Sequence, residues 1–399
     1  MWDSRVRAGY APELHQSSSA YWATELPQLK PNMLLPRVRP KTATFPFDAP
    51  QVQYVHFARN AIFFLAQQMG LAGQEMLMPA YFHGVELEAL LAAGVKPRFF
   101  AVRTGMQVDP NEIEAAITPA TRAIYLIHYA GMPGPAAAVR ELCRTRGLLF
   151  IEDCALALLS KAGEQPLGSF GDAAVFCLYK TLPTPDGGAV VMKEGRLSIP
   201  GQRPPFITSA RQTAAAVLTH FERHASAPVQ RLVRGLKAVG KAATRRAAGQ
   251  WVEVGTQDFD VRDVNVLMSH VSHRIVAAQD FSSIVTARRR NFLQLNDHLG
   301  DLSASVFPSL PDGMCPLFYP LATPHKIELW RRLRSRGVQA VLFWLGGSSG
   351  PRPGEFPEVD ALRRTVLELP CHQDMTPEHV ERLAHVVRAC MRGLDGTLP

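Results

Sequence analysis

The sequence predicts an α/β protein with a mostly parallel central sheet, helices on both faces of that sheet, and a smaller C-terminal α+β domain. Short apolar segments alternate with amphipathic helical patterns from about residue 52 to residue 200. This alternation is typical of βαβ units, whose strands run parallel and whose connecting helices cover the sheet. The chain has 399 residues, 47% of them hydrophobic and 20% charged, which indicates two or three globular domains and not a disordered chain.

The elements are expected in a regular order along the chain. Helical spacing of apolar residues indicates helices at Ala61–Met69, Val85–Ala93, Asn111–Ile117 and Ala136–Arg146. Short apolar runs between them indicate strands at Glu75–Met78, Arg98–Val102, Ala123–Ile127, Leu148–Ile151, Ala173–Leu178 and Gly188–Met192. Further along, Val261–Leu299 is expected to be largely helical, and two strand–helix passages complete the chain.

These patterns divide the chain into three parts. Residues 1–50 are rich in proline, serine and polar residues and are interpreted as an extended lead-in segment. Residues 51–255 are expected to form the large domain, and residues 256–399 the small one. The sequence contains no apolar run long enough to span a membrane and no pattern typical of a secretory signal, so we expect a cytoplasmic protein.

The positive charge of the chain is concentrated in one insert, residues 201–250. The formal net charge is +8, and this insert holds nine arginines and lysines against the single acid Glu222. Apolar residues recur there at helical spacing, which predicts a basic amphipathic helix through Leu232, Val233, Leu236 and Val239. One interpretation is an ordinary solvated helix face; the other is attraction to a phosphorylated substrate or to an acidic membrane surface. Nucleic acid is not expected as a partner, because no recognition motif accompanies the charge.

The cysteines and histidines do not have the spacing of metal ligands. The six cysteines contain no C-x-x-C pair, and the thirteen histidines contain no H-E-x-x-H. We therefore expect no metal site and interpret the cysteines as mostly buried free thiols.

Three features in a fixed order carry the chemistry. A helix begins near Arg59–Asn60, and its free N–H groups suit a phosphate. A buried strand ends in the acidic residue Asp153, and a later apolar strand runs directly into Lys180. Each feature has a common structural explanation by itself: an ordinary helix start, a helix cap and a surface lysine. Together they match what pyridoxal phosphate needs, because a lysine can carry its aldehyde and a carboxylate can keep its ring nitrogen protonated.

Several longer segments resemble the DegT/DnrJ/EryC1/StrS family of sugar aminotransferases, within the fold-type I pyridoxal phosphate enzymes. The passage ITPATRAIYLIHYAG matches the family pattern and includes His128 and Gly131. The family's I-E-D-x-A motif is Ile151–Ala155, and its glycine-rich G-x-x-G-D passage is Gly168–Phe176. The spacing from the family lysine to its glycine pair is met by Lys180 and Gly187–Gly188.

The resemblance implies a role for particular residues. Lys180 matches the Schiff-base lysine, and Asp153 matches the partner of the pyridine nitrogen. His83 falls where the family places an aromatic side chain against the cofactor ring, and Asn265 resembles an asparagine that reaches the phosphate from the neighbouring subunit of a homodimer. The implied cofactor-binding residues are Arg59, Asn60, His83, Asp153, Cys177, Lys180 and Asn265.

The resemblance also implies a reaction. The expected activity moves an amino group from a donor such as glutamate to a keto sugar, nucleotide-linked, in polysaccharide or glycoconjugate biosynthesis. Two alternatives remain open: another pyridoxal phosphate reaction on a non-sugar substrate, and a weakened scaffold with a binding role. They remain open because Leu156 stands where the family has a Gln or His, and leucine cannot form a hydrogen bond.

Overall fold

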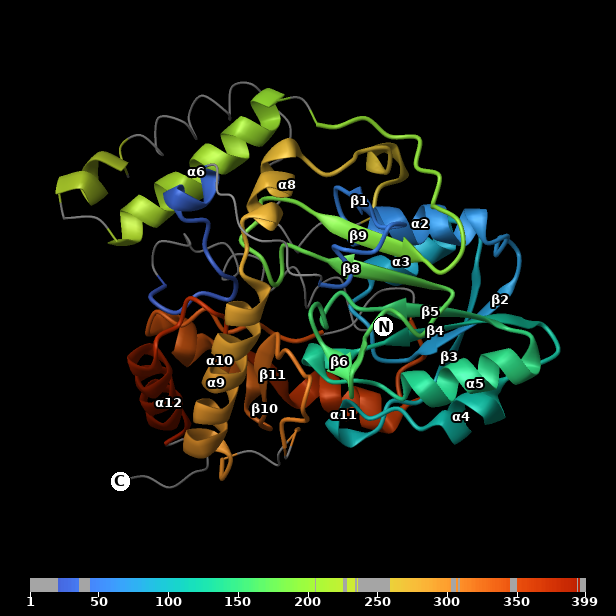
Figure 1. Cartoon of the computed structure of the whole chain (residues 1–399). Coiled ribbons are helices and arrows are strands. Elements are labelled where there is room, and N and C mark those ends of the chain that lie inside the picture. The colour runs from blue at the N-terminus through green and yellow to red at the C-terminus, as the bar shows by residue number, and fades with distance from the viewer. Residues whose placement is uncertain are drawn as a thin grey trace.

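A seven-stranded sheet forms the centre of the protein (Figure 1). The computed structural model describes residues 21–35, 44–204, 206–224, 228–233, 235, 259–302, 306–307, 309–344, 350–392 and 394. The strand order is β1-β9-β8-β5-β4-β2-β3. The strands are β1 (Gln53–Val55), β2 (Glu75–Pro79), β3 (Lys96–Phe100), β4 (Thr121–Ile127), β5 (Leu149–Asp153), β8 (Ala173–Cys177) and β9 (Gly188–Met192).

The sheet is mostly parallel, as the sequence predicts. Strands β3, β2, β4, β5 and β8 pair in parallel, whereas β9 runs antiparallel to both β8 and β1. The carboxyl ends of the five parallel strands therefore lie at one edge of the sheet, which is where open α/β sheets bind ligands.

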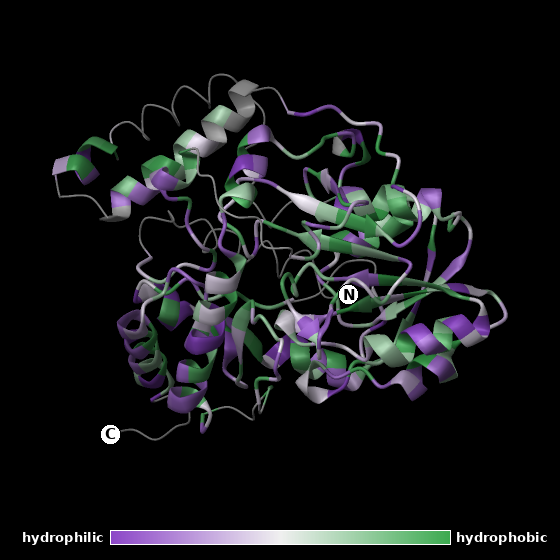
Figure 2. Cartoon of the chain, viewed as in Figure 1, coloured by the Kyte–Doolittle hydropathy of each residue, from purple (hydrophilic) through white to green (hydrophobic). Residues whose placement is uncertain are grey.

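Helices cover both faces of this sheet. Helices α2 (Ala58–Gln68) and α3 (Val85–Ala92) pack on one face, and α4 (Pro110–Ala116) and α5 (Ala136–Arg146) pack on the other. Each face has its own apolar core because side chains alternate along a strand: Ile151 lies in one core and its neighbour Phe150 in the other. In Figure 2 the central strands are largely hydrophobic, whereas α5 carries a hydrophilic side.

The C-terminal part contains a small antiparallel sheet with helices around it (Figure 1). Its strands are β10 (Phe318–Ala322) and β11 (Val366–Pro370), and its helices are α9 (Phe281–Leu299), α10 (Lys326–Ser335), α11 (Pro357–Thr365) and α12 (Pro377–Met391). The predicted helical stretch 261–299 is divided into η5 (Val261–Asp263), α8 (His270–Ala277) and α9. The breaks occur because Ser269 and Asp280 cap the starts of new helices with their side-chain oxygens.

Shorter elements connect these parts. They are the two-stranded hairpin β6 (Lys161–Ala162) and β7 (Gln165–Pro166), and the 3-10 turns η2 (Pro31–Leu34), η3 (Thr104–Met106) and η4 (Tyr129–Gly131). In the basic insert, α6 spans Phe206–His224 and residues 228–233 are helical, with Leu232 exposed and Val233 buried. Leu236 and Val239 of the predicted basic helix lie outside the described residues. No helix in the described part of the chain has the length and apolarity needed to cross a bilayer.

The C-terminal part contacts the large sheet-containing part beside the carboxyl end of β4. The backbone N–H of Leu317 donates to the carbonyl of Ala130, and the backbone N–H of Cys315 donates to the hydroxyl oxygen of Ser160 at 2.9 Å. Gly131 has a φ of +95°, and a Cβ there would lie 2.2 Å from the carbonyl oxygen of Cys315. Only glycine fits this junction, because any side chain would meet backbone atoms of the facing segment.

We predict that Gly131→Ala lowers the free energy of unfolding by at least about 2 kcal/mol, because the methyl group adds both backbone strain and a clash. Urea unfolding followed by circular dichroism measures this effect. Gly235→Ala is the matched control, since a Cβ at Gly235 meets no atom within 4 Å. Equal midpoints for the two variants would contradict the proposed tight contact.

Candidate active site

One cavity lies at the carboxyl edge of the sheet and collects the chemistry-bearing residues. Strands β4, β5 and β8 contribute their last residues to it, and Lys180 follows β8 by three positions. The cavity is lined by Phe57, Ala58, Arg59, Ile62, His83, Val85, Glu86, Ile127, Asp153, Ala155, Leu156, Cys177, Tyr179, Lys180 and Trp344.

Asp153 is a buried carboxylate with two fixed hydrogen bonds. The Tyr125 hydroxyl donates to Oδ2 at 2.7 Å, and the backbone N–H of Ala155 donates to Oδ1 at 2.8 Å. Burial raises the pKa of Asp153 above the ordinary value, and the Tyr125 hydrogen bond opposes that rise. Each oxygen keeps a free lone pair, so Asp153 can still accept a hydrogen bond from a protonated ring nitrogen.

The preceding residue, Glu152, faces the other side of β5 and organises the structure behind the site. It accepts hydrogen bonds from three backbone N–H groups of the 168–171 turn, at 2.7 to 2.9 Å. His128 Nδ1 accepts from the N–H of Gly134, so its Nε2 carries the proton that bonds Glu152 at 3.0 Å. Cys154 lies close enough for these three side chains to bind a metal, but both His128 nitrogens are already engaged within the fold. We assign this group a structural role.

The C-terminal domain holds the backbone beside Lys180. The carbonyl of Thr181 accepts hydrogen bonds from Gln373 Nε2 at 2.9 Å and from Arg288 Nη2 at 3.3 Å. Arg288 is fully buried on α9 and also binds carbonyls of the segment before β10. The position of Lys180 therefore depends on contacts from both domains.

The start of α2 offers an anion-binding surface. Its first residues carry no acidic side chain, and Phe57 at the N-cap makes no side-chain capping bond. The Arg59 guanidinium lies 4.2 Å from the centroid of the Phe57 ring. Strand β9 approaches closely here, because a Cβ on Gly188 would lie 2.5 Å from the backbone nitrogen of Ala58. The backbone N–H groups of the first helical turn, the helix dipole and a guanidinium together suit a phosphate.

A second buried carboxylate, Glu86, stabilises the turn that carries His83. Glu86 accepts the backbone N–H of His83 at 2.7 Å and that of Gly84 at 3.0 Å. Burial raises the pKa of Glu86, and the nearby Asp153 carboxylate raises it further. This contact fixes the backbone of His83 at the wall of the cavity.

The structure brings five of the seven expected cofactor residues to this cavity: Arg59, His83, Asp153, Cys177 and Lys180. Burial raises the pKa of the Cys177 thiol. The other two residues do not line the cavity. Asn60 is buried and donates through Nδ2 to the carbonyl of Val264 at 3.2 Å, so it connects α2 to the segment that contains Val264. Asn265 is exposed on this chain.

Sequence reasoning missed several residues of the site. Tyr125 lies in the middle of a buried strand and has no local signal for its contact with Asp153. Glu86 carries a weak signal, since acidic residues in the first turn of a helix often bind free N–H groups. Trp344 was not missed, because its loop is one of those expected from the sequence to set specificity; it lines the cavity although it is distant in sequence from every other lining residue.

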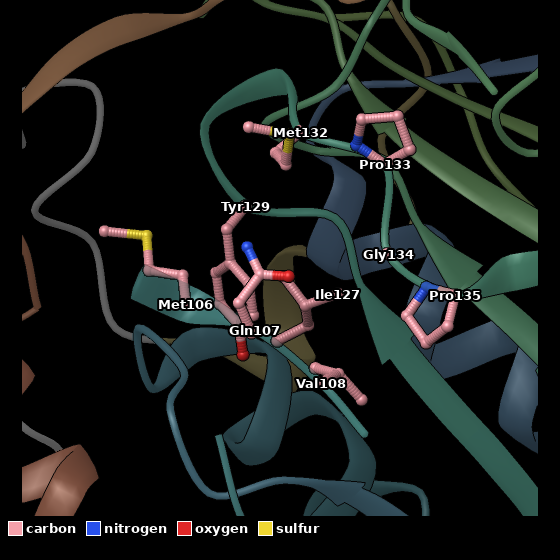
Figure 3. A pocket seen from close by; sticks show the side chains of 9 residues that line it. All are labelled: Met106, Gln107, Val108, Ile127, Tyr129, Met132, Pro133, Gly134 and Pro135. Carbon is pink, nitrogen blue, oxygen red and sulfur yellow. The ribbon is translucent and has the colours of Figure 1, made fainter. Parts of the chain in front are cut away.

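A second cavity, of about 210 Å³, adjoins the first and shares Ile127 with it. It is lined by Met106, Gln107, Val108, Ile127, Tyr129, Met132, Pro133, Gly134 and Pro135. Figure 3 shows Tyr129, Gln107 and Ile127 on one side and Pro133–Pro135 on the other. Met106 and Ala130 beside it have positive φ values of 56° and 53°, which are uncommon for residues with a Cβ.

The sequence is similar to known aminotransferases. The model of the DegT/DnrJ/EryC1/StrS aminotransferase family matches residues 58–199. A dTDP-3-amino-3,4,6-trideoxy-alpha-D-glucose transaminase of Micromonospora megalomicea is 39% identical over 321 residues, covering 75% of this chain and 74% of the relative. A dTDP-4-dehydro-2,3,6-trideoxy-D-glucose 4-aminotransferase of Saccharopolyspora spinosa is 26% identical over 372 residues, covering 88% of each chain.

Solved structures agree with the fold. The aminotransferase TlmJ from Streptoalloteichus hindustanus matches with a TM-score of 0.63 and 22% identity, over 86% of this chain and 87% of that chain. DesV of S. venezuelae matches with a TM-score of 0.60 and 20% identity, over 85% and 84%. These similarities confirm the predicted fold-type I architecture.

We predict that Asp153→Asn changes the pH dependence of stability in the cofactor-free protein. Because burial raises the pKa of Asp153, the folded wild type loses stability as pH rises from the ordinary carboxyl pKa of about 4 through the raised value. The variant cannot titrate there. Its free energy of unfolding, relative to wild type, should therefore increase with pH, by about 1.4 kcal/mol per unit of pKa shift.

Urea unfolding at a series of pH values measures this difference. Asp312→Asn serves as the control, because that carboxylate is fully exposed. If the Asp153→Asn and wild-type curves run parallel between about pH 4 and 8, the carboxylate does not titrate with a raised pKa.

Proposed function

The chain belongs to the DegT/DnrJ/EryC1/StrS aminotransferase family, and we propose that it is a pyridoxal-phosphate-dependent aminotransferase acting on a nucleotide-linked keto sugar. The amino group would come from an amino acid, with glutamate as the first candidate. The observation that carries the proposal is the Lys180 amine and the Asp153 carboxylate in one cavity at the sheet edge. Relatives named as dTDP-sugar and UDP-sugar aminotransferases support the substrate class, and the product would serve polysaccharide or glycoconjugate synthesis.

The residues of the cavity fit pyridoxal phosphate. The start of α2 and the Arg59 guanidinium would hold the phosphate, and Asp153 would face the ring nitrogen. His83 would lie against the ring, and Lys180 would bind the aldehyde carbon covalently. Cys177, at the end of β8, lies beside the same phosphate position in this proposal. The lining therefore offers a partner for the phosphate, the ring nitrogen and the aldehyde of the cofactor.

The cofactor, when bound, supplies a ring that accepts electrons from the reacting carbon. The protein itself holds one proton in place and transfers another. The Asp153 carboxylate holds a proton on the ring nitrogen, and its hydrogen bonds from Tyr125 and Ala155 keep the carboxylate in place. The Lys180 amine accepts and returns a proton at Nζ beside the substrate carbon.

Leu156 favours a second candidate, a different pyridoxal phosphate reaction on a non-sugar substrate. Its side chain lines the cavity and is buried, yet it offers no hydrogen bond to the oxygen of the cofactor ring. The sugar aminotransferase remains the better-supported proposal, because relatives aligned over most of the chain are named for that activity.

We also propose a homodimer in the cytoplasm. Asn265 is exposed and does not line the cavity of its own chain, which leaves it available to a partner's phosphate site. The excess of positive charge in the basic insert suits a diphosphate-bearing substrate, and it would equally suit peripheral contact with an anionic membrane.

Lys180→Ala should abolish covalent attachment of the cofactor and reduce amino transfer by at least about a thousandfold, because both the attachment and the proton transfer use this amine. Borohydride treatment followed by mass spectrometry of the denatured protein measures the attachment. The exposed Lys193→Ala provides the control. Retention of the cofactor mass on Lys180→Ala would mean that another lysine is the attachment site.

Mixing Lys180→Ala protein with Asn265→Ala protein should restore activity that each lacks alone. A mixed dimer has one site with both residues intact, so random exchange restores about a quarter of the wild-type sites. Activity after subunit exchange, followed over time, measures this recovery. If no activity returns although mass analysis detects mixed dimers, Asn265 acts within its own chain or not at all.

A further inference from the structure

Trp344 lines the proposed active-site cavity together with His83 and Lys180. It lies in the C-terminal domain, and only 7% of its surface is exposed. Its backbone has a φ of +39°, a left-handed conformation that is sterically costly for a residue with a large side chain. Strained residues of this kind persist where the surrounding structure holds them, often at ligand sites.

A half-buried guanidinium holds this strained backbone in place. Arg363 on α11 donates to the carbonyl of Trp344 at 3.2 Å. The same guanidinium donates to the carbonyls of Phe82 at 3.3 Å and Ala80 at 3.1 Å, which follow β2 in the large domain. Arg363 therefore fixes the position of Trp344 relative to the turn that carries His83.

A second cation supports the same loop. Lys326 is almost completely buried, and its Nζ donates at 2.8 Å both to the carbonyl of Phe343 and to that of Arg363. Burial lowers the pKa of Lys326 to about 7. Arg363 and Lys326 thus bind the consecutive carbonyls of Trp344 and Phe343, and these hydrogen bonds fix the backbone of Trp344 at the cavity wall.

The indole of Trp344 belongs to a cluster of packed aromatic rings. Phe343 stacks on Trp344 with ring centroids 4.2 Å apart and an angle of 23°, so one indole face is covered. Tyr81 and Tyr129 pack against the indole at steep angles, at 5.1 and 5.6 Å. The Tyr129 hydroxyl is engaged by the carbonyl of Tyr81, so it offers the cavity no free donor. Trp344 lines the cavity beside His83, whose ring centroid lies 6.3 Å from that of the indole, so a ligand in the cavity meets the part of the indole that these rings leave uncovered.

We propose that Trp344 is the platform on which the sugar ring of the substrate packs, an inference that rests on the proposed sugar aminotransferase function. The faces of a pyranose ring carry C–H groups with a small positive charge, and these pack well on the negative face of an indole. An amino-acid donor such as glutamate has no comparable face. Trp344 is thus a specificity residue for the sugar half of the reaction and contributes little to the donor half.

The test compares Trp344→Ala and Trp344→Phe with wild type in the two half-reactions, each with the cofactor-loaded enzyme. For the keto-sugar half, we expect kcat/KM to fall about tenfold in Trp344→Ala, mainly through KM, and less in Trp344→Phe, which keeps an aromatic ring. For the donor half, the rate of the spectral change on adding glutamate should differ between each variant and wild type by less than about threefold. Equal losses in both halves would overturn the proposal, since they would indicate a general structural defect.

Trp22→Phe is the matched control, because Trp22 packs against Arg382 and His379 on α12 and does not line the cavity. Cofactor absorbance and thermal unfolding check that each variant folds. If Trp344→Ala does not fold, the comparison of Trp344→Phe with Trp22→Phe decides: an unchanged sugar KM in Trp344→Phe would then overturn the proposal.

A binding experiment separates failure of the platform from failure of the proposed function. The probe dTDP-glucose carries a sugar but no ketone, so it can bind without reacting, and dTDP alone lacks the sugar. Calorimetry should give Trp344→Ala a weaker affinity for dTDP-glucose, by about tenfold, and an unchanged affinity for dTDP. Equal weakening for both probes overturns the platform alone. If wild type binds neither probe nor responds to any amino donor, the proposed function and the platform fail together.

Discussion

The burial of two consecutive carboxylates at the end of β5 is the constraint on which the rest of the site depends. Because side chains alternate along a strand, Glu152 and Asp153 point to opposite faces of the same sheet. Glu152 satisfies the 168–171 turn and His128, and so holds the segment that leads into β8 and Lys180. Asp153 is left with two donors and spare acceptor capacity in the cavity. One acid thus stabilises the fold, and the other remains available for chemistry.

The C-terminal part of the chain contributes directly to the site. Two arginines of the C-terminal part bind backbone carbonyls near the sheet edge. The fully buried Arg288 binds Thr181, next to Lys180, and the half-buried Arg363 binds the turn after β2. Backbone carbonyls are good partners for a guanidinium, which has five donors and no acceptor. These contacts fix the backbone next to Lys180 and the backbone of Trp344 relative to the sheet edge.

The site carries a cost in stability. Asp153 and Glu86 are buried near one another, and the pKa of each is raised because the charged forms lose their hydration. Such groups are retained where a ligand uses them, and a bound cofactor with a protonated ring nitrogen would compensate Asp153. Two glycines reflect a separate, steric constraint. Gly131 and Gly188 lie so close to backbone atoms of facing segments that any larger residue would prevent the approach.

The sequence by itself predicted the alternation of strands and helices, because apolar periodicity is a local signal. It pointed to Lys180 and Asp153 only through the combination of several segments, since each of these residues has a common structural explanation when taken alone. Only the tertiary structure determined which side chains contact one another around the site. Tyr125 reaches Asp153 across adjacent strands, Asn60 turns its amide to Val264, and Arg363 contacts Phe82 from 281 residues away. No local pattern encodes such contacts, since they depend on how separate elements pack against one another, and that packing is a property of the whole chain.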